Sequence, residues 1–130
     1  MTATDTTDAP LITDADILAR AESLVGPAND RTLWPFFIDR HDVQLRALIP
    51  IDHIPENPPA DEIERIVALF AKVSSDWGIG GIAYVIERPG GAEPTPNDVA
   101  LAENLAEASR RRALPHRATV LVHDTGARLL

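Results

Sequence analysis

Residues 82–98 read IAYVIERPGGAEPTPND, and this stretch decides the class of fold. Its first five residues, Ile82 to Ile86, form a continuous apolar run, which is typical of a strand buried on both faces. Residues 88–96 are rich in Gly and Pro and predict a loop. Thr95, followed by a proline and by Asp98, then predicts a helix start with a threonine N-cap and an acid in the first turn. We therefore expect a buried strand that one loop connects to a helix.

Two other segments show the periodicity of amphipathic helices. In residues 61–77 the apolar residues recur at helical spacing, and acidic residues occupy the first turn, where they favour the helix dipole. A shorter helix is predicted from Thr13, which has capping-box spacing to Asp16, up to the pair Gly26-Pro27. The helix that follows the Gly- and Pro-rich loop is expected to end near Arg112.

The remaining apolar segments predict strands. Residues 32–38 (TLWPFFI) and 43–51 (VQLRALIPI) are rich in strand formers and flank a polar turn, so they predict a β-hairpin. Pro35 and Pro50 have no N–H, which predicts that each lies at an edge, a bulge or a strand end. Residues 118–130 predict two strands around a tight turn. The expected fold is α/β, a mixed sheet with helices packed on it in the order α-β-β-α-β-α-β-β.

The chain is long enough for one domain. It has 130 residues, 45% of them hydrophobic, and no stretch of about 18 apolar residues that would predict a membrane span. Residues 1–10 predict a disordered acidic tail, which leaves residues 11–130 as a single α/β domain. The lack of cysteine excludes disulfides and thiolate chemistry and favours a cytoplasmic location. The net charge of −8 disfavours nucleic acid as a partner, and residues 1–30 carry −5 of it.

The 82–98 stretch resembles the JAB/MPN (JAMM) metalloprotease-like family, and most closely its RadC-type branch. In that family a buried strand ends in His-x-His-Pro, a Gly-containing loop with a Pro-(Thr/Ser) element follows, and Ser-x-x-Asp starts a helix. The resemblance covers roughly residues 31–130 in the order of elements and implies a JAB/MPN-like fold. With one residue of loop shortening, the matching residues are Pro89, Gly91, Glu93-Pro94, Thr95 and Asp98.

The resemblance also implies that the metal site is lost. The family binds zinc through two imidazoles and one carboxylate, and the metal acidifies a water that attacks a carbonyl. The two His positions fall on Ile86 and Arg88; isoleucine has no lone pair, and a guanidinium repels a cation. Only Asp98 remains as a ligand, Thr95 replaces the Ser, and the 32–51 hairpin has no Glu to act as general base. We therefore expect neither metal nor cofactor at this degenerate site.

Two interpretations of Arg88 and Asp98 remain open. An ion pair between them would replace the electrostatic role of the metal and hold the 88–98 loop against the helix. Alternatively, Thr95 and Asp98 form only a helix cap, and Arg88 is solvated. The helix cap and the ion pair can both be present.

Two further sets of residues are surface candidates. Trp34, Phe36 and Phe37 would form an association surface on an edge strand; the alternative is core packing, with the N-terminal helix covering one face. A basic cluster either caps a helix C-terminus and aids solubility or contacts an acidic partner or nucleic acid. Its members are Arg110, Arg111, Arg112 and Arg117.

Other catalytic patterns have little support. No two of the histidines His41, His53, His116 and His123 have the spacing of metal ligands on one helix. Residues 77–81 (WGIGG) lie after a helix and before a strand, so they predict a helix C-cap and a turn rather than a phosphate-binding loop. No serine lies in a GxSxG motif.

We expect a non-catalytic domain that binds a protein partner or associates with itself, for example as a homodimer. The alternative from another class is a metal-independent, hydrolase-like enzyme that uses Asp98 with Glu87 or Glu93 as acid and base groups. A third alternative is a structural protein unrelated to the family. A deep polar cleft around Asp98 would favour the enzyme, whereas a loop closed by Arg88 would favour the binding module.

Overall fold

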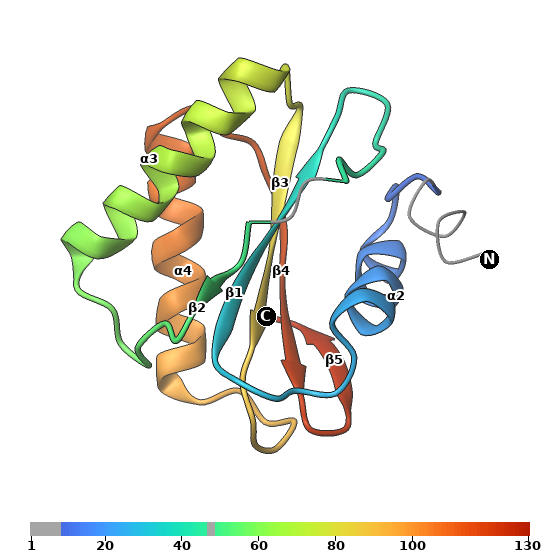
Figure 1. Ribbon diagram of the computed structural model, residues 1–130. Coiled ribbons are helices and arrows are strands. Elements are labelled where there is room, and N and C mark those ends of the chain that lie inside the picture. The colour runs from blue at the N-terminus through green and yellow to red at the C-terminus, as the bar shows by residue number, and fades with distance from the viewer. Residues whose placement is uncertain (1–8, 47–48) are drawn as a thin grey trace.

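The computed structural model describes residues 9–46 and 49–130 and shows an α/β fold (Figure 1). Among these residues, five strands form one mixed sheet and three helices pack on its faces. The predicted α/β class with helices packed on a mixed sheet is confirmed. Residues 1–8 of the predicted tail lie outside the described residues. No helix in the described part is long and apolar enough to cross a membrane. The elements are α2 (Asp14–Val25), β1 (Thr32–Ile38), β2 (Ile51–Asp52), α3 (Ala60–Trp77), β3 (Gly81–Glu87), α4 (Pro96–Arg111), β4 (His116–His123) and β5 (Gly126–Leu129).

The strands lie in the order β2-β1-β3-β4-β5, with β3 at the centre. β1 runs antiparallel to β3 along the whole of both strands. β3 and β4 are parallel because α4 crosses over between them, and β5 returns antiparallel to β4 after a tight turn. The carboxyl ends of β3 and β4 therefore lie at the same end of the sheet, beside the start of α4.

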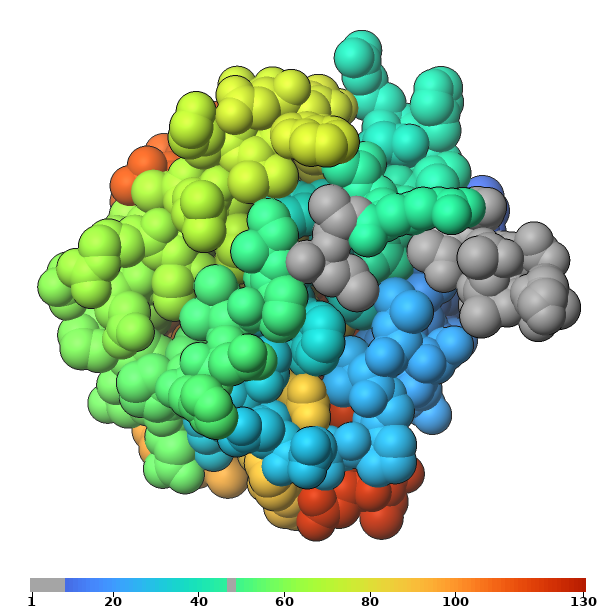
Figure 2. Space-filling model, in the orientation of Figure 1, coloured from blue at the N-terminus to red at the C-terminus, as the bar shows by residue number. Residues whose placement is uncertain are grey.

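β3 is buried on both faces, as its apolar sequence predicts. Its even-numbered residues, such as Tyr84, belong to a core beneath α3 and α4, together with Phe70 and Leu105. Its odd-numbered residues, such as Val85, belong to a second core beneath α2, together with Ile17. Three layers result, with α3 and α4 on one face of the sheet and α2 on the other (Figure 1). In the space-filling view, α2 and the segment 49–59 leave little of the sheet visible (Figure 2).

Local sequence signals place the helix ends. Thr13 and Thr95 each accept a hydrogen bond from the backbone N–H three residues later, and Asp16 and Asp98 accept one from the N-cap N–H in return. Complete capping boxes therefore begin α2 and α4. α3 ends at Gly78, whose φ of 67° lies in the left-handed region that glycine tolerates. The sequence predicts all three ends correctly.

The prediction of a strand over residues 43–51 is wrong for most of the residues that the structure describes there. Only Gln44 forms a bridge to β1, and β2 is limited to two residues at the end of the segment. Pro50 has no N–H for a ladder. The N–H of Leu45 donates to the carbonyl of Phe37 beside that single bridge, and the side chains of Leu45 and Ile49 pack against the core beneath α3. The apolar pattern reflects burial of side chains rather than pairing of the backbone.

The predicted association surface on β1 is also wrong. Phe36 and Phe37 are both 0% exposed and lie in opposite cores, and Trp34 is half-buried against the core beneath α2. Neither phenylalanine can meet a partner in this fold. The alternative of core packing on two faces, with α2 as one cover, is confirmed.

The outer edge of β1 is closed to a partner strand. The carbonyl oxygen of Arg31 accepts a hydrogen bond from the N–H of Ile54, after β2. The carbonyl oxygen of Phe37 accepts one from the N–H of Leu45, before β2. Odd-numbered residues of β1 therefore direct their backbone groups away from β3, and Leu33 pairs with β2. Pro35 is the odd-numbered residue between these contacts, and it has no N–H to offer. β1 thus meets the prediction that its proline faces an edge.

Phe36→Ala and Phe37→Ala are each expected to lower the free energy of unfolding by about 3–5 kcal/mol, because each removes a fully buried ring. Trp77→Ala is the control, since that ring is 67% exposed; its effect is expected to stay within about 0.5 kcal/mol. Urea unfolding measures all three. If either phenylalanine variant matched the control, one face of β1 would be uncovered, against the three-layer fold.

Candidate functional site

The loop after β3, the turn after β4 and the start of α4 meet at one end of the sheet. The N–H of Gly90 donates to Asp124 Oδ1 at 3.0 Å, and the N–H of Asp124 donates to the Gly90 carbonyl at 3.0 Å. In open α/β sheets, ligands bind outside the carboxyl ends of the strands, which is this region. Of the predicted degenerate-site residues, the structure brings Arg88, Thr95 and Asp98 together here, whereas Ile86 lies in the core beneath α3 and α4.

Arg88 is buried beneath its own loop, with 4% of its surface exposed. Its Nε and Nη2 donate to Asp98 Oδ2 at 3.1 and 2.8 Å. Its Nη1 donates to the carbonyl of Gly91 at 2.7 Å, and Nη2 also donates to that of Glu93 at 3.0 Å. In place of water, a carboxylate and two carbonyl groups therefore accept the hydrogen bonds of the guanidinium. These bonds connect the loop to α4.

Gly90 leaves the room that the guanidinium needs. Its φ is 119°, and a Cβ placed there would lie 3.0 Å from Arg88 Nη1. A residue with a side chain at position 90 would therefore be strained and would press on the guanidinium. The glycine-rich loop and the arginine form one packed unit.

Asp98 serves both the helix cap and the ion pair. Its Oδ2 accepts from the N–H of Thr95 at 2.9 Å in addition to the two bonds from Arg88. Burial by itself would raise the pKa of Asp98, but the hydrogen bonds from Arg88 and Thr95 outweigh it and hold the pKa below the ordinary value of 3.8. Asp98 is therefore ionised at neutral pH. The predicted ion pair and the predicted cap are both present.

The residues of this site do not fit a metal ion. Ile86 is fully buried in the core and offers no donor atom, and the cationic Arg88 already occupies the carboxylate of Asp98. Within residues 9–46 and 49–130, no three His, Cys, Asp or Glu side chains group in a way that could hold a metal ion. What the arrangement can do is hold a loop rigidly against a helix start.

Glu87 and Glu93 do not join Asp98 in an acid–base group. Glu87 lies on the α2 side of the sheet, where its carboxylate accepts from the N–H of Asn29 at 2.7 Å and from Trp34 Nε1 at 3.0 Å. The side chain of Glu93 is 96% exposed. The three carboxylates of the enzyme alternative therefore point in different directions.

The predicted basic cluster is divided in space, and each member has an acidic partner. Arg110 pairs with Glu107, Arg112 pairs with Glu64, and Arg111 pairs with both acids. Arg117 lies apart from them and pairs with Asp42 at 2.9 Å. These contacts compensate most of the positive charge of the cluster and support the interpretation as helix capping and surface solubility.

The four histidines either lie on the surface or pack within the fold. His41 and His53 are exposed, and His123 is buried beside Thr125. His116 stacks on Tyr84 with ring centroids 5.9 Å apart; burial, helped by the charge of Arg110, lowers its pKa from 6.5. Burial also raises the pKa of Tyr84 to about 12. His116 is therefore neutral at neutral pH and behaves as a packing residue.

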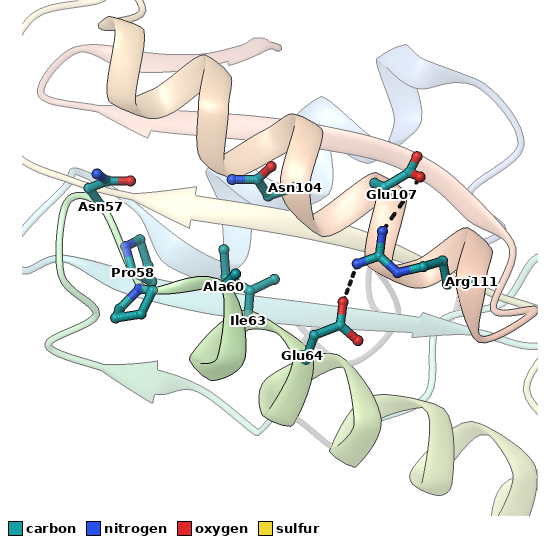
Figure 3. A pocket seen from close by; sticks show the side chains of 9 residues that line it. Asn57, Pro58, Ala60, Ile63, Glu64, Asn104, Glu107 and Arg111 are labelled. Carbon is teal, nitrogen blue, oxygen red and sulfur yellow. Dashed lines mark hydrogen bonds and ion pairs between the residues drawn. The ribbon is translucent and has the colours of Figure 1, made fainter.

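A polar cavity of about 370 Å³ lies between the start of α3 and the second half of α4 (Figure 3). At one end Arg111 lies between Glu64 and Glu107 and joins the two helices (Figure 3). The other end is lined by the amides of Asn57 and Asn104 and by two prolines. Every charged side chain that lines this cavity has an oppositely charged partner, so the cavity offers neither an acid nor a base for catalysis.

Sequence reasoning missed the anchoring role of Glu87. Its carboxylate fixes the connection between α2 and β1 by binding the N–H groups of Asn29 and Asp30 as well as Trp34. A charged residue that directly continues a buried apolar run was the available signal, because such a charge must find donors within the fold. Its partners come from a distant segment, which the sequence pattern does not identify.

No protein-family model matches the chain, and no curated protein matches it. The chemistry open to the site follows from its own donors, acceptors and charges.

Arg88→Met is expected to lower the free energy of unfolding by about 3–5 kcal/mol, because it leaves the Asp98 carboxylate buried without its partner. Asp98→Asn is also expected to lower the free energy of unfolding. The loss in the double variant is expected to be smaller than the sum of the two single losses, and the difference is expected to exceed about 1 kcal/mol. Urea unfolding of the four proteins gives this coupling.

The matched control is an exposed ion pair, Lys72 with Asp76 on α3, whose N–O distance is 3.3 Å. Lys72→Met and Asp76→Asn are expected to be additive, because water screens that pair. Additivity at Arg88 and Asp98 as well would mean that the buried pair does not hold the loop.

The contribution of Asp98 is expected to depend on pH. Because its pKa is lower in the folded protein than the ordinary 3.8, the unfolded chain binds the proton first as the pH falls. The stability advantage of the wild type over Asp98→Asn is therefore full above the ordinary pKa and disappears as the pH falls through the folded value. Urea midpoints of both proteins across that range measure it; a gap that widened toward acid would contradict the assignment.

Proposed function

We propose that this chain is a non-catalytic, JAB/MPN-like domain that acts in the cytoplasm as a protein-binding or scaffolding module. The observation that carries this proposal is the buried ion pair of Arg88 with Asp98, at 2.8 Å. It lies at the position where the resemblance implies a metal, and it fills that position with a guanidinium. A site closed in this way has room for neither a metal ion nor a reacting group.

The geometry around this pair also supports the proposal. A buried strand, a Gly-containing loop, and a helix start with Thr95 and Asp98 as its cap follow one another as the resemblance implies. The loop is bonded to the turn after β4 through Gly90 and Asp124. The chain order from β1 to β5 agrees with the order that the resemblance implies for residues 31–130. A structural protein unrelated to the family would not require the 88–98 loop to pack on both β3 and α4.

The enzyme alternative receives less support. It needs a carboxylate with an accessible proton near a second acid or base, and a polar cleft around Asp98. Asp98 is 2% exposed, its pKa is lowered, and Glu87 and Glu93 lie elsewhere. The loop closed by Arg88 is the arrangement expected of the binding module.

Rebuilding the metal site tests the proposal. The wild type, purified without an affinity tag, is expected to take up no stoichiometric zinc. Ile86→His combined with Arg88→His would place two imidazoles on the side of β3 that faces Asp98, and it is expected to bind zinc or cobalt, the latter with a tetrahedral absorption spectrum. Adding Asp98→Asn to that variant is the control and is expected to weaken the binding.

Two results would contradict the proposal. Stoichiometric zinc in the wild type, lost on Asp98→Asn, would mean that the metal site has not been lost. A double-histidine variant that keeps its circular dichroism spectrum but binds no metal would remove the support for the JAB/MPN-like assignment.

A further inference from the structure

β5 is the last strand of the sheet on the side opposite to β2 (Figure 1). The N–H of Leu130 donates to the carbonyl of Thr119 at 2.9 Å, so even-numbered residues at this end direct their backbone groups at β4. The backbone groups of Ala127 and Leu129 therefore point away from the sheet. Within the part of the chain that the structure describes, the N–H of neither residue donates a hydrogen bond. This edge is open, whereas the β1 edge is closed.

An apolar cavity of about 290 Å³ lies beside this edge, on the face of the sheet that α4 covers. Its apolar wall is formed by Val99, Ala102, Ala106 and Leu130, and Val99 is 43% exposed. Three polar side chains complete the lining, those of Glu103, His116 and Thr119. The Thr119–Leu130 pair places the cavity next to the end of β5. An apolar side chain that entered it would leave water.

Arg128 projects from β5 on the same face as Leu130, since side chains alternate along a strand. Its side chain is 44% exposed, and the carboxylate that it reaches is Glu93 Oε1 at 4.0 Å. Glu93 is itself 96% exposed, so water screens this pair strongly. Nη1 of Arg128 also donates to the carbonyl of Ala92 at 3.3 Å. The guanidinium remains available to a carboxylate across the open edge.

We propose that the edge of β5 is the docking site of the module and takes an extended segment of a partner protein by strand addition. The backbone of the segment pairs with Ala127 and Leu129. The segment carries an acidic residue opposite Arg128 and, two positions away on the same face, an apolar residue that enters the cavity. This inference rests on the proposed function and names the kind of partner that the module binds.

A second copy of the chain is a poorer occupant of this edge. When β5 pairs antiparallel with itself through Ala127 and Leu129, the symmetric register places two Arg128 side chains directly opposite each other. Like charges in that position destabilise a strand pair. Charge complementarity therefore favours an acidic segment over self-association.

The probe is the blocked peptide acetyl-Thr-Val-Thr-Glu-Thr-Val-Thr-amide, in which the acid and both valines share one face. Titrated into isotope-labelled protein, it is expected to shift the amide resonances of Ala127 and Leu129 and to slow their hydrogen exchange. The same peptide with lysine in place of glutamate is expected to bind about three- to tenfold more weakly. Arg128→Glu is expected to reverse this preference.

Leu129→Pro tests the backbone contact, because it removes an outward N–H that has no partner within the fold. It is expected to weaken peptide binding by about three- to tenfold, the value of one hydrogen bond. Leu129→Val keeps the N–H and is the matched control, which is expected to bind like the wild type. If Leu129→Pro failed to fold, the charge reversal at Arg128 would decide alone.

Three results would overturn the proposal: shifts that leave Ala127 and Leu129 unchanged, a charge preference that Arg128→Glu does not reverse, or no binding at millimolar peptide. A concentration-dependent dimer that Leu129→Pro abolishes would assign the edge to a second copy and would overturn it too. None of these results bears on metal uptake at Arg88, so the docking site and the non-catalytic assignment can fail separately.

Discussion

All seven residues of β3 are buried, and the burial of both faces of this strand is the constraint on which the rest of the structure depends. A sheet with one covered face would leave either Tyr84 or Val85 in water, so helices must pack on both sides. α3 and α4 cover one face, and α2 covers the other. The same requirement draws Phe36 and Phe37 of the neighbouring strand into opposite cores. It leaves them unavailable for association.

The end of β3 sets the chemistry of the molecule. A strand with no exposed face delivers Arg88 into the interior, where a guanidinium is stable only with a carboxylate and carbonyl groups around it. Asp98, already fixed by the capping box of α4, supplies the carboxylate, and Gly90 supplies the space. One helix cap therefore also neutralises a buried cation. The same contact holds the loop after β3 against the start of α4.

The two edges of the sheet differ in what they offer. Beside β1, Pro35 has no N–H, and described segments before and after β2 bond to the carbonyl groups of Phe37 and Arg31. Beside β5, the N–H groups of Ala127 and Leu129 have no partner among residues 9–46 and 49–130, and they lie next to an apolar cavity and the exposed Arg128. Natural sheets close or charge their edges to prevent unwanted pairing, and Arg128 is such a charge on the edge of β5. A segment that pairs there must therefore compensate this charge, as the acidic residue of the proposed partner would.

The sequence by itself determined the features that depend on residues close together in the chain. The capping boxes at Thr13 and Thr95, the end of α3 at Gly78 and the doubly buried β3 all follow from short-range patterns. It left the contact of Arg88 with Asp98 as one of two alternatives, since that contact requires the loop to fold back on α4. Only the tertiary structure decided that Phe36 and Phe37 are core residues, that residues 43–51 are mostly not a strand, and that β5 is the open edge. The reason is that burial and pairing depend on neighbours from distant segments, which the periodicity of one segment does not specify.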